Sequence, residues 1–451
     1  MQPNRPRVAI ATLGCKVNQY ESAALAAAFA RGGFEVVNFD REAEVYVINT
    51  CTVTHLGDRK SRQLIRRAVR QNPAALVVAT GCYAQVSPQE VREIPGVHLV
   101  LGNQEKADLV EQVQKALEVR GAVRSSGPDS ATVQVGDIMH SHLFQELPAV
   151  AAPERTRAFI KVQEGCNNFC AYCIIPYARG PVRSRPLDSV LEEAHRLVEQ
   201  GYPELVITGI HIGAYGQDFS DGTDLARLVA KLRQIRGIKR LRLGSVEPLD
   251  FSPRLVEVLA AGPPVCRHLH IPLQSGDDTV LHNMRRRYTT ADYARLVNQL
   301  RRAVPQLAIT TDLITGFPGE TDEQHRRTMS FVREMAFARL HVFKFSPRRG
   351  TPAASLPDRV PAQEIEERSR QLIELGNHLA GQFAAGFIGE QVEVLVEEVA
   401  DEPGCVKGYT DQYLPVVFPG SSELRGRIVP VRGREVRSDI LLGIPAGGII
   451  F

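Results

Sequence analysis

The sequence runs Gly165-Cys166-Asn167-Asn168-Phe169-Cys170-Ala171-Tyr172-Cys173 directly after an apolar strand pattern, Phe159-Ile160-Lys161-Val162-Gln163. The cysteine spacing is C-x3-C-x2-C, which places three thiolates on one short loop. Thiolates are soft ligands that suit zinc or an iron–sulfur centre. A structural zinc site takes four ligands, and no fourth cysteine or histidine follows nearby. The loop is therefore predicted to hold a metal centre through three cysteines.

A four-iron cluster normally takes four cysteines, so three leave one iron open to another molecule. The amine and carboxylate of S-adenosylmethionine (SAM) can chelate that iron, and an electron then breaks the S–C5′ bond to give a 5′-deoxyadenosyl radical. We therefore predict a [4Fe–4S] cluster on Cys166, Cys170 and Cys173, with SAM as the second cofactor. Two alternatives stay open on this motif alone: a zinc site with a distant fourth ligand, and three unrelated buried cysteines.

Strand and helix patterns alternate over residues 155–385, the segment that contains this loop. The expected strands are 159–163, 205–208, 240–243, 268–271, 307–313 and 340–343, with helices that include 187–200, 291–302 and a last one at 364–383. Such alternation implies parallel strands joined by helices. Five or six units suit a full or partial βα barrel.

A second alternating segment, residues 1–120, precedes the barrel. Its expected strands are 8–13, 34–37, 45–50 and 76–80, and its expected helices are 23–31 and 58–71. This pattern predicts an open parallel α/β sheet. The stretch 121–154 is rich in serine, glycine and proline and is predicted to be a linker or surface extension.

Three further cysteines, Cys15, Cys51 and Cys82, each follow the carboxyl end of an expected strand in that sheet. Loops at those ends converge in an open parallel sheet. We therefore predict a second three-thiolate site made of residues distant in sequence. The alternative is three separate structural cysteines, since free cysteines are commonly buried. Cys266 and Cys405 have no partner in the sequence pattern and are taken as structural.

The last segment, residues 386–451, changes period. Gln391 to Glu397 alternates apolar and polar residues, and glycines and prolines then recur every several residues. This pattern predicts a small antiparallel β-barrel of about five strands.

Composition limits the remaining function classes. The 451 residues exceed what a single core usually spans, and 43% hydrophobic with 23% charged residues excludes wholesale disorder. The formal charge of +3 is too balanced to indicate a nucleic-acid binder, so any basic footprint must be local. No apolar run approaches the roughly 18–20 residues of a membrane span, and no leader pattern is present. We expect no membrane association, a cytoplasmic location and reduced cysteines.

The motifs GCKVNQYES, NTCTVT, GCYAQ and GCNNFCAYCIIPYARG together resemble those of the radical-SAM methylthiotransferases. The resemblance covers essentially the whole chain and implies a methylthiotransferase domain, a radical-SAM barrel and a TRAM-type β-barrel that binds RNA. Within the family the first two motifs resemble the MtaB type, which methylthiolates N6-threonylcarbamoyladenosine at position 37 of tRNA. The alternatives are methylthiolation of isopentenyladenosine-37 or of a ribosomal-protein side chain. A non-enzymatic alternative is a zinc-dependent RNA-binding protein.

The resemblance implies two [4Fe–4S] clusters with different tasks. The cluster on Cys166, Cys170 and Cys173 binds and cleaves SAM, and the cluster on Cys15, Cys51 and Cys82 holds the sulfur to be inserted. One SAM methylates that sulfur, and a second supplies the radical that removes hydrogen from C2 of the adenine. The implied partner is the anticodon stem-loop of tRNA, and the electron donor and sulfur source stay unidentified.

Residues at the carboxyl ends of the barrel strands are candidates for binding SAM. They are Tyr172, Gly209, His211, Ser245, Glu247, Gln274 and Asp312. Three have simpler alternatives: Tyr172 packs the loop, His211 is a surface histidine, and Glu247 only bonds a neighbouring loop. Basic groups at Arg62/Arg66/Arg70, Arg285–Arg287 and Arg348–Arg349 are candidates for phosphate contacts, and Tyr409 and Tyr413 for stacking on bases, with a core role as the alternative.

Overall fold

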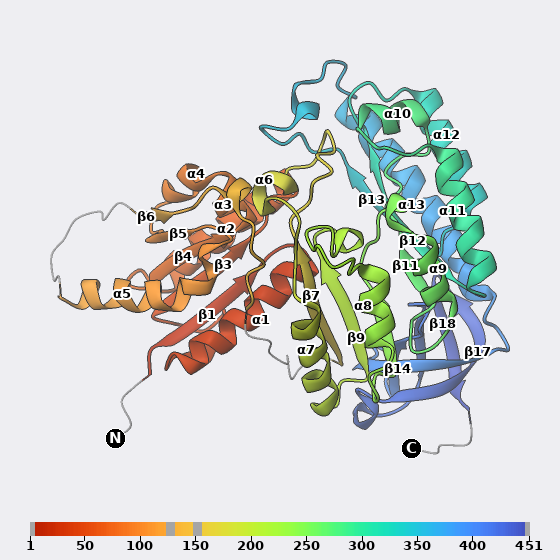
Figure 1. The fold of residues 1–451 in the computed structure, drawn as a ribbon, viewed down its shortest axis with the longest axis horizontal. Coiled ribbons are helices and arrows are strands. Elements are labelled where there is room, and N and C mark those ends of the chain that lie inside the picture. The colour runs from red at the N-terminus through yellow and green to blue at the C-terminus, as the bar shows by residue number, and fades with distance from the viewer. Residues whose placement is uncertain (1–4, 123–130, 148–155, 447–451) are drawn as a thin grey trace. The chain divides into compact units, whose positions relative to one another are not determined.

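The computed structural model describes residues 5–122, 131–147 and 156–446, and they form two compact units (Figure 1). The first unit comprises Met1–Ala151, Lys161–Arg185 and Ser346–Thr351, and the second comprises Ala152–Ile160, Pro186–Phe345 and Pro352–Phe451. Both sets of predicted cluster cysteines belong to the first unit. Among the described residues, no helix has the length and apolarity needed to cross a membrane.

The first unit is built on a parallel sheet with the strand order β2-β1-β3-β4-β5-β6. Its strands are β1 (Arg7–Thr12), β2 (Glu35–Val37), β3 (Val45–Thr50), β4 (Leu76–Gly81), β5 (Leu99–Leu101) and β6 (Thr132–Gln134), and its helices are α1 (Lys16–Arg31), α2 (His55–Gln71), α3 (Cys82–Val86), α4 (Pro88–Arg92), α5 (Leu109–Ala122) and α6 (Ile175–Arg179). One face packs on α1 and α5, and the other packs on α2, α3 and α4. All residues of β3 and β4 are buried, as expected for central parallel strands covered on both faces.

The predicted open sheet is confirmed, and two elements differ from expectation. Helix α1 begins at Lys16 and not at residue 23 as predicted, so the polar residues 18–22 are helical as well. Strand β6 lies within the predicted linker 121–154 and pairs in parallel with β5. The parts of that linker at 123–130 and 148–154 lie outside the described residues.

The second unit contains the parallel strands of the predicted barrel. They are β9 (Glu204–Gly209), β10 (Arg240–Leu243), β11 (His268–His270), β12 (Ala308–Thr315) and β13 (Arg339–Lys344). Parallel ladders join β9 to β10, β11 to β12, and β12 to β13. The isolated bridges Leu241↔Val265 and Ser245↔His270 connect the first pair to the other three strands. The helices between and after them are α7 (Leu187–Glu199), α8 (Leu225–Leu232), α9 (Pro253–Ala260), α10 (Asp278–Asn283), α11 (Thr290–Ala303), α12 (Asp322–Met335) and α13 (Ala362–Ala385). This architecture is a partial βα barrel, as predicted.

Strand β7 (Arg157–Glu164) carries the chain from the second unit into the first. Its end pairs in antiparallel fashion with β8 (Arg183–Ser184) through Gln163↔Ser184 and Glu164↔Arg183. The C-x3-C-x2-C loop and α6 lie between these two strands.

The C-terminal segment is a closed five-stranded barrel with the order β14-β15-β16-β18-β17. Its strands are β14 (Gln391–Val399), β15 (Cys405–Tyr409), β16 (Pro415–Pro419), β17 (Ile428–Arg437) and β18 (Ile440–Pro445). The predicted barrel is confirmed, and its pairs are antiparallel except that β16 and β18 run in parallel. Ala384 and Phe387, at the end of α13, complete its core.

Buried charges tie this barrel to β9 and β10. Arg242 Nε donates to Glu204 Oε1 at 2.7 Å, and its Nη1 donates to the Asp411 carbonyl at 3.0 Å. The ring of Tyr413 packs 5.0 Å from that of Tyr409 and 4.7 Å from the Arg242 guanidinium. Both tyrosines are half-buried and take part in this packing, and their stacking on bases stays a prediction.

Candidate metal centre

The cysteines Cys15, Cys51 and Cys82 follow the carboxyl ends of three adjacent parallel strands. Cys51 comes directly after β3 and Cys82 directly after β4, and the residues before them, Thr50 and Gly81, are register partners. Cys15 follows β1, which pairs with β3 on its other side. The sheet therefore brings these three loops to one edge, as the sequence predicted.

Two glycines allow the loops to approach. Gly14 has φ +99°, and a Cβ built on it would lie 3.0 Å from Cys51 Sγ. Gly81 has φ +95°, and a Cβ there would lie 2.5 Å from the Thr50 carbonyl oxygen. Side chains are rarely tolerated in this left-handed region, and here they would also collide with the neighbouring loop.

Asn18 fastens the first two loops together. Its Nδ2 donates to the Leu13 carbonyl at 2.7 Å and to the Thr50 carbonyl at 3.1 Å. Asn49 Nδ2 in turn donates to the Asn18 carbonyl at 3.1 Å. These bonds fix the backbone on either side of Cys15 and next to Cys51.

The loop with Cys166, Cys170 and Cys173 is folded back on its own ends. Cys166 N donates to the Gly180 carbonyl at 3.0 Å, and Cys173 N donates to the Cys170 carbonyl at 3.0 Å. Gly165 has φ +74°, and a Cβ there would lie 1.8 Å from the Pro181 carbonyl oxygen, so only glycine fits at the start of the loop. Tyr172 is half-buried within this loop.

Arg179, at the end of α6, connects the two cysteine sets. Its Nε donates to Cys82 Sγ at 3.2 Å, its Nη1 donates to Glu21 Oε1 at 2.5 Å, and its Nη2 donates to Asn18 Oδ1. The residue is 1% exposed. The buried guanidinium therefore contacts Cys82, a predicted ligand of one cluster. Arg179 itself ends the short helix α6, which directly follows the loop that carries the predicted ligands of the other cluster.

A buried charge cluster surrounds this arginine. Glu21 accepts from Lys106 Nζ at 2.5 Å and from Lys161 Nζ at 2.8 Å, and Glu164 pairs with Lys161 and Arg179. Burial raises the pKa of Glu21, but Arg179, Lys106 and Lys161 outweigh it and hold that pKa well below its usual range. Three cations thus face two carboxylates, which leaves positive charge next to Cys82 that suits a cluster of thiolates.

Each triplet offers three cysteine thiols, the type of donor from which an iron–sulfur cluster is held. In the protein without iron, burial first and then the neighbouring Cys82 and Cys15 thiols raise the pKa of Cys51 to about 11. A metal bound by these three sulfurs would hold them as thiolates.

Arg348 differs from its predicted role. It is 6% exposed, its Nη2 lies 2.6 Å from Asp58 Oδ2, and it also donates to Thr52 Oγ1 at 2.6 Å. The expectation that it contacts phosphate is therefore wrong. It instead fixes the loop directly after Cys51.

The other predicted SAM-binding residues lie in the second unit. His211 is not a surface histidine: it is 6% exposed, and its Nε2 lies 2.6 Å from Asp250 Oδ2. Glu247 forms an ion pair with Arg286, and Gly209 ends β9. Ser245 is exposed and forms the bridge to His270. Their contact with SAM stays a prediction.

Gln274 and Asp312 lie on neighbouring segments. Gln274 has φ 71° and its N donates to the Asp312 carbonyl at 2.8 Å. Burial raises the pKa of Asp312, but hydrogen bonds from His270 and His341 hold it well below its usual range. Asp312 is thus an ionised acceptor held between two imidazoles.

Sequence reasoning missed Asn18, Glu21, Arg179, Lys106 and Lys161. Each is a polar residue on an otherwise ordinary helix or strand, and its partners lie up to 161 positions away, as for Arg179 and Asn18. The available signal was the run Asn18-Gln19-Tyr20-Glu21-Ser22 beside Cys15, whose polar residues face inward from α1.

Comparison with known families matches three parts of the chain. Residues 160–332 match the radical SAM superfamily, residues 7–102 match the uncharacterized protein family UPF0004, and residues 387–445 match the TRAM domain. The first match defines the class: this is a radical-SAM protein, which implies a [4Fe–4S] cluster and SAM.

Relatives that span nearly the whole chain narrow the class. The threonylcarbamoyladenosine tRNA methylthiotransferase MtaB of Bacillus subtilis is 45% identical over 94% of this chain and 93% of its own length. A tRNA-2-methylthio-N(6)-dimethylallyladenosine synthase of Moorella thermoacetica is 35% identical over 96% of this chain and 97% of its own. The chain belongs to the radical-SAM methylthiotransferase family.

Solved structures agree at the level of the fold alone. The radical SAM methyltransferase TsrM of Kitasatospora setae, with cobalamin and a [4Fe–4S] cluster, has a TM-score of 0.56 and 18% identity, covering 90% of this chain and 81% of that one.

Proposed function

We propose that this chain is a tRNA methylthiotransferase that converts N6-threonylcarbamoyladenosine at position 37 to its 2-methylthio derivative. The observation that carries the proposal is the pair of three-cysteine sets in one compact unit, joined through Arg179. The 45% identity to a relative named for this reaction supports the choice of substrate. The net change replaces the C2–H bond of the adenine by a C2–SCH3 bond.

The second cluster, on Cys15, Cys51 and Cys82, is part of the proposal. When bound, the clusters and SAM supply the sulfur, the methyl group and the radical that removes hydrogen from an unactivated carbon. The chain's own residues bind and orient: Asn18 and Arg348 fix the loops at Cys15 and Cys51, and Arg179 donates to Cys82. Hydrogen bonds to a cluster sulfur tune its potential.

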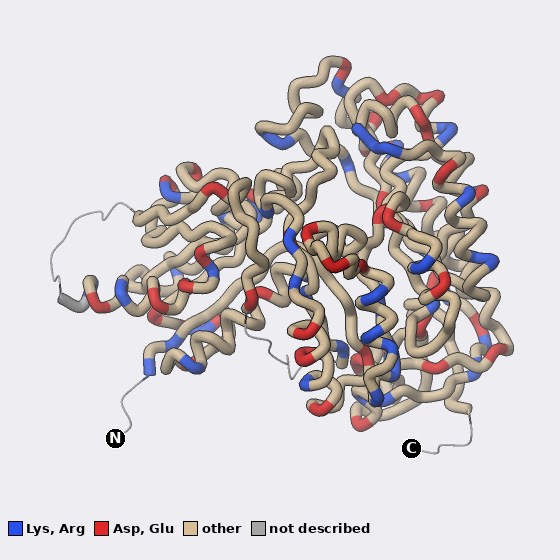
Figure 2. Tube along the Cα trace, in the orientation of Figure 1, with Lys and Arg blue, Asp and Glu red and all other residues tan. Residues whose placement is uncertain are grey.

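The tRNA partner is supported by a local basic face on α2. Arg59 and the predicted Arg66 and Arg70 are exposed, and among the described residues none of them forms an ion pair. The third predicted arginine, Arg62, is half-buried and donates to Tyr83 Oη at 3.0 Å. Figure 2 shows acidic and basic residues interspersed over both units. The basic face is therefore a local feature, in which several basic residues lie close together along one helix, α2. Arginines spaced by four residues share one side of a helix and can meet successive phosphates.

The experiment uses anaerobically purified protein, reconstituted with iron and sulfide and incubated with SAM, reductant and tRNA lacking the methylthio group. Mass spectrometry of the nucleosides should show threonylcarbamoyladenosine converted to its methylthio form. Protein with fully loaded clusters that cleaves no SAM would refute the enzymatic proposal.

A second candidate substrate follows from the 35% identical relatives named for dimethylallyladenosine. The same assay, run in parallel on tRNA carrying isopentenyladenosine, separates the two. Conversion of the isopentenyl nucleoside alone would replace the proposed substrate, and release of cleaved SAM without either product would direct the search to protein side chains.

A further inference from the structure

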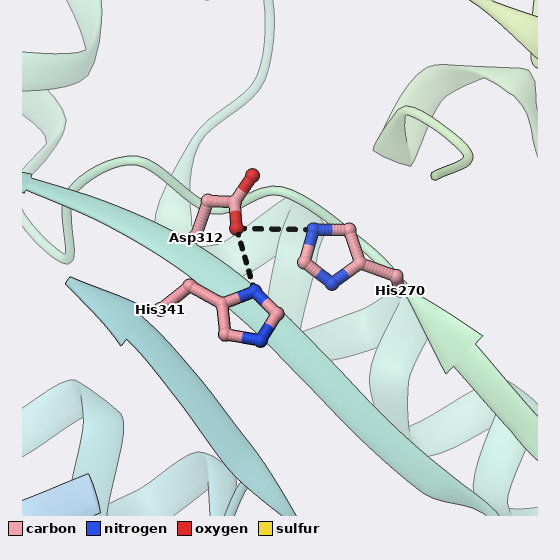
Figure 3. Close-up of side chains that lie close together, drawn as sticks. All are labelled: His270, Asp312 and His341. Atoms are coloured by element: carbon pink, nitrogen blue, oxygen red, sulfur yellow. Dashed lines mark hydrogen bonds and ion pairs between the residues drawn. The ribbon is translucent and has the colours of Figure 1, made fainter. Parts of the chain in front are cut away.

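Three side chains meet on the barrel strands β11, β12 and β13, away from every cysteine triplet in the sequence. Figure 3 shows His270, Asp312 and His341 pointing toward one another. Asp312 Oδ1 lies 3.2 Å from His270 Nε2 and 3.1 Å from His341 Nδ1. The ligand atoms of the three residues all lie within 4.8 Å of one another.

The register of β11, β12 and β13 places these three side chains next to one another. Asp312 and His341 are direct register partners in the parallel pair β12/β13, and His270 is the register partner of Thr310 in β11/β12. Residues 310 and 312 share one face of β12 because side chains alternate along a strand. The three side chains are therefore held by the ladder itself and not by a loop.

The separations fit a shared metal ion. Ligands about 2.0–2.2 Å from one ion, at angles between octahedral and tetrahedral, lie about 3.0–3.5 Å apart. Both measured N···O distances, 3.1 and 3.2 Å, fall in that range. The same distances match direct hydrogen bonds, and zinc binding distinguishes the two arrangements.

The surroundings favour ligation in two further ways. His270 Nδ1 lies 2.9 Å from Thr310 Oγ1, and when Nδ1–H donates to this hydroxyl, Nε2 is left unprotonated and can bind a metal. The side chains of His270, Asp312 and His341 are 12%, 26% and 47% exposed, which gives an ion an entry path from the side of His341. The two rings are stacked, with centroids 5.3 Å apart.

We propose that His270, Asp312 and His341 form a mononuclear site for a divalent transition metal, separate from the cysteine centres and with an open coordination position. Two imidazoles and one carboxylate suit zinc, ferrous iron, cobalt or nickel and exclude the thiolate-bound clusters as the occupant. The proposal involves no redox step and does not rest on the identity of the tRNA substrate.

The test uses the holoenzyme with its clusters loaded and zinc as the probe. After incubation with zinc and desalting, the metal content and the zinc K-edge absorption are measured on wild type, His341→Ala and the matched surface control His195→Ala. Wild type and the control should retain one zinc per chain with nitrogen and oxygen ligands at about 2.0–2.1 Å, and His341→Ala should not.

A second variant tests the supporting hydrogen bond. Thr310→Val keeps the shape of the side chain but removes the bond to His270, and should weaken zinc binding about 10- to 100-fold in a competition titration. Equal zinc retention in wild type and His341→Ala, or sulfur ligands at about 2.3 Å, would overturn the site. If neither wild type nor any variant retained zinc, the three side chains would form only a hydrogen-bonded cluster without a metal, and the proposed site would be overturned as well.

Discussion

At the level of single side chains, Glu21 is the acceptor on which three buried cations converge. We predict that Glu21→Gln lowers the free energy of unfolding by about 3–5 kcal/mol, because it leaves Lys106, Lys161 and Arg179 with one buried carboxylate, Glu164. Urea unfolding followed by circular dichroism measures the change. The control Glu111→Gln removes an exposed pair with Lys115 and should leave the free energy of unfolding nearly unchanged. Equal destabilisation of the two variants would contradict the role of the buried cluster.

Glu204 carries a pH dependence in the second unit. Burial raises its pKa, but Arg242, Arg157 and Arg240 outweigh burial and lower it. A carboxyl whose folded pKa lies below its unfolded value of about 4.3 stabilises the fold above that pH and loses the effect as the pH falls through the folded pKa. The free-energy gap between wild type and Glu204→Gln should therefore be constant from pH 7 down to about 5 and shrink below about 4.3. A gap that widens on acidification would refute this assignment.

At the level of elements, the turn between β4 and α3 depends on Gly81. Gly81→Ala should destabilise the first unit and displace Cys82, because its Cβ would meet the Thr50 carbonyl at 2.5 Å. Gly33→Ala is the matched control: its φ is +88° but its Cβ meets nothing within 4 Å, so it should cost only the roughly 1–2 kcal/mol of a left-handed residue. Iron content after reconstitution should fall in Gly81→Ala and stay at the wild-type value in Gly33→Ala. Full iron loading of Gly81→Ala would contradict the role of Gly81 in positioning Cys82 as a cluster ligand.

Helix α2 is the element on which the basic face can be tested. The double variant Arg66→Glu/Arg70→Glu should weaken tRNA binding by about tenfold and lower the salt dependence of the affinity by roughly one unit of slope for each phosphate that the helix no longer binds. Fluorescence titrations at several salt concentrations measure both. Arg196→Glu, an exposed arginine on α7, should leave affinity and slope unchanged. Equal weakening by Arg196→Glu would show a general charge effect instead.

The sequence predicts elements well where a local pattern determines them. Strands β3 and β10 have the predicted bounds, because runs such as Val45–Thr50 must be buried on both faces. The convergence of Cys15, Cys51 and Cys82 at one edge of the sheet was also predictable, because the carboxyl ends of parallel strands lie at the same edge. The start of α1 was not, because Asn18 and Glu21 are polar and become buried only through distant partners. The His341 ligand was missed for the same reason: only the β12/β13 register places it beside Asp312.

At the level of the whole molecule, both cysteine triplets belong to one compact unit although the chain between them is long. Residues Lys161–Arg185 belong to the same compact unit as the N-terminal sheet. The loop that binds SAM in the proposal is thus anchored by Arg179 to Cys82 and Glu21. Both predicted clusters lie in one compact unit, but they have no cysteine ligand in common. A mutation in one set of cysteines should therefore remove one of the two reaction steps and leave the other.

The separation of tasks gives the last prediction. Cys166→Ala should abolish SAM cleavage, because the remaining cysteines of its loop hold the cluster incompletely. Cys51→Ala should keep SAM cleavage but stop methylthio insertion, because it removes a ligand only from the second set. Chromatography of 5′-deoxyadenosine and mass spectrometry of the nucleosides measure the two steps. Cys405→Ala, half-buried at the start of β15, is the control and should retain both. If Cys51→Ala also failed to cleave SAM while the cluster on Cys166, Cys170 and Cys173 stayed loaded, the two centres would act as one and their separate tasks would be refuted.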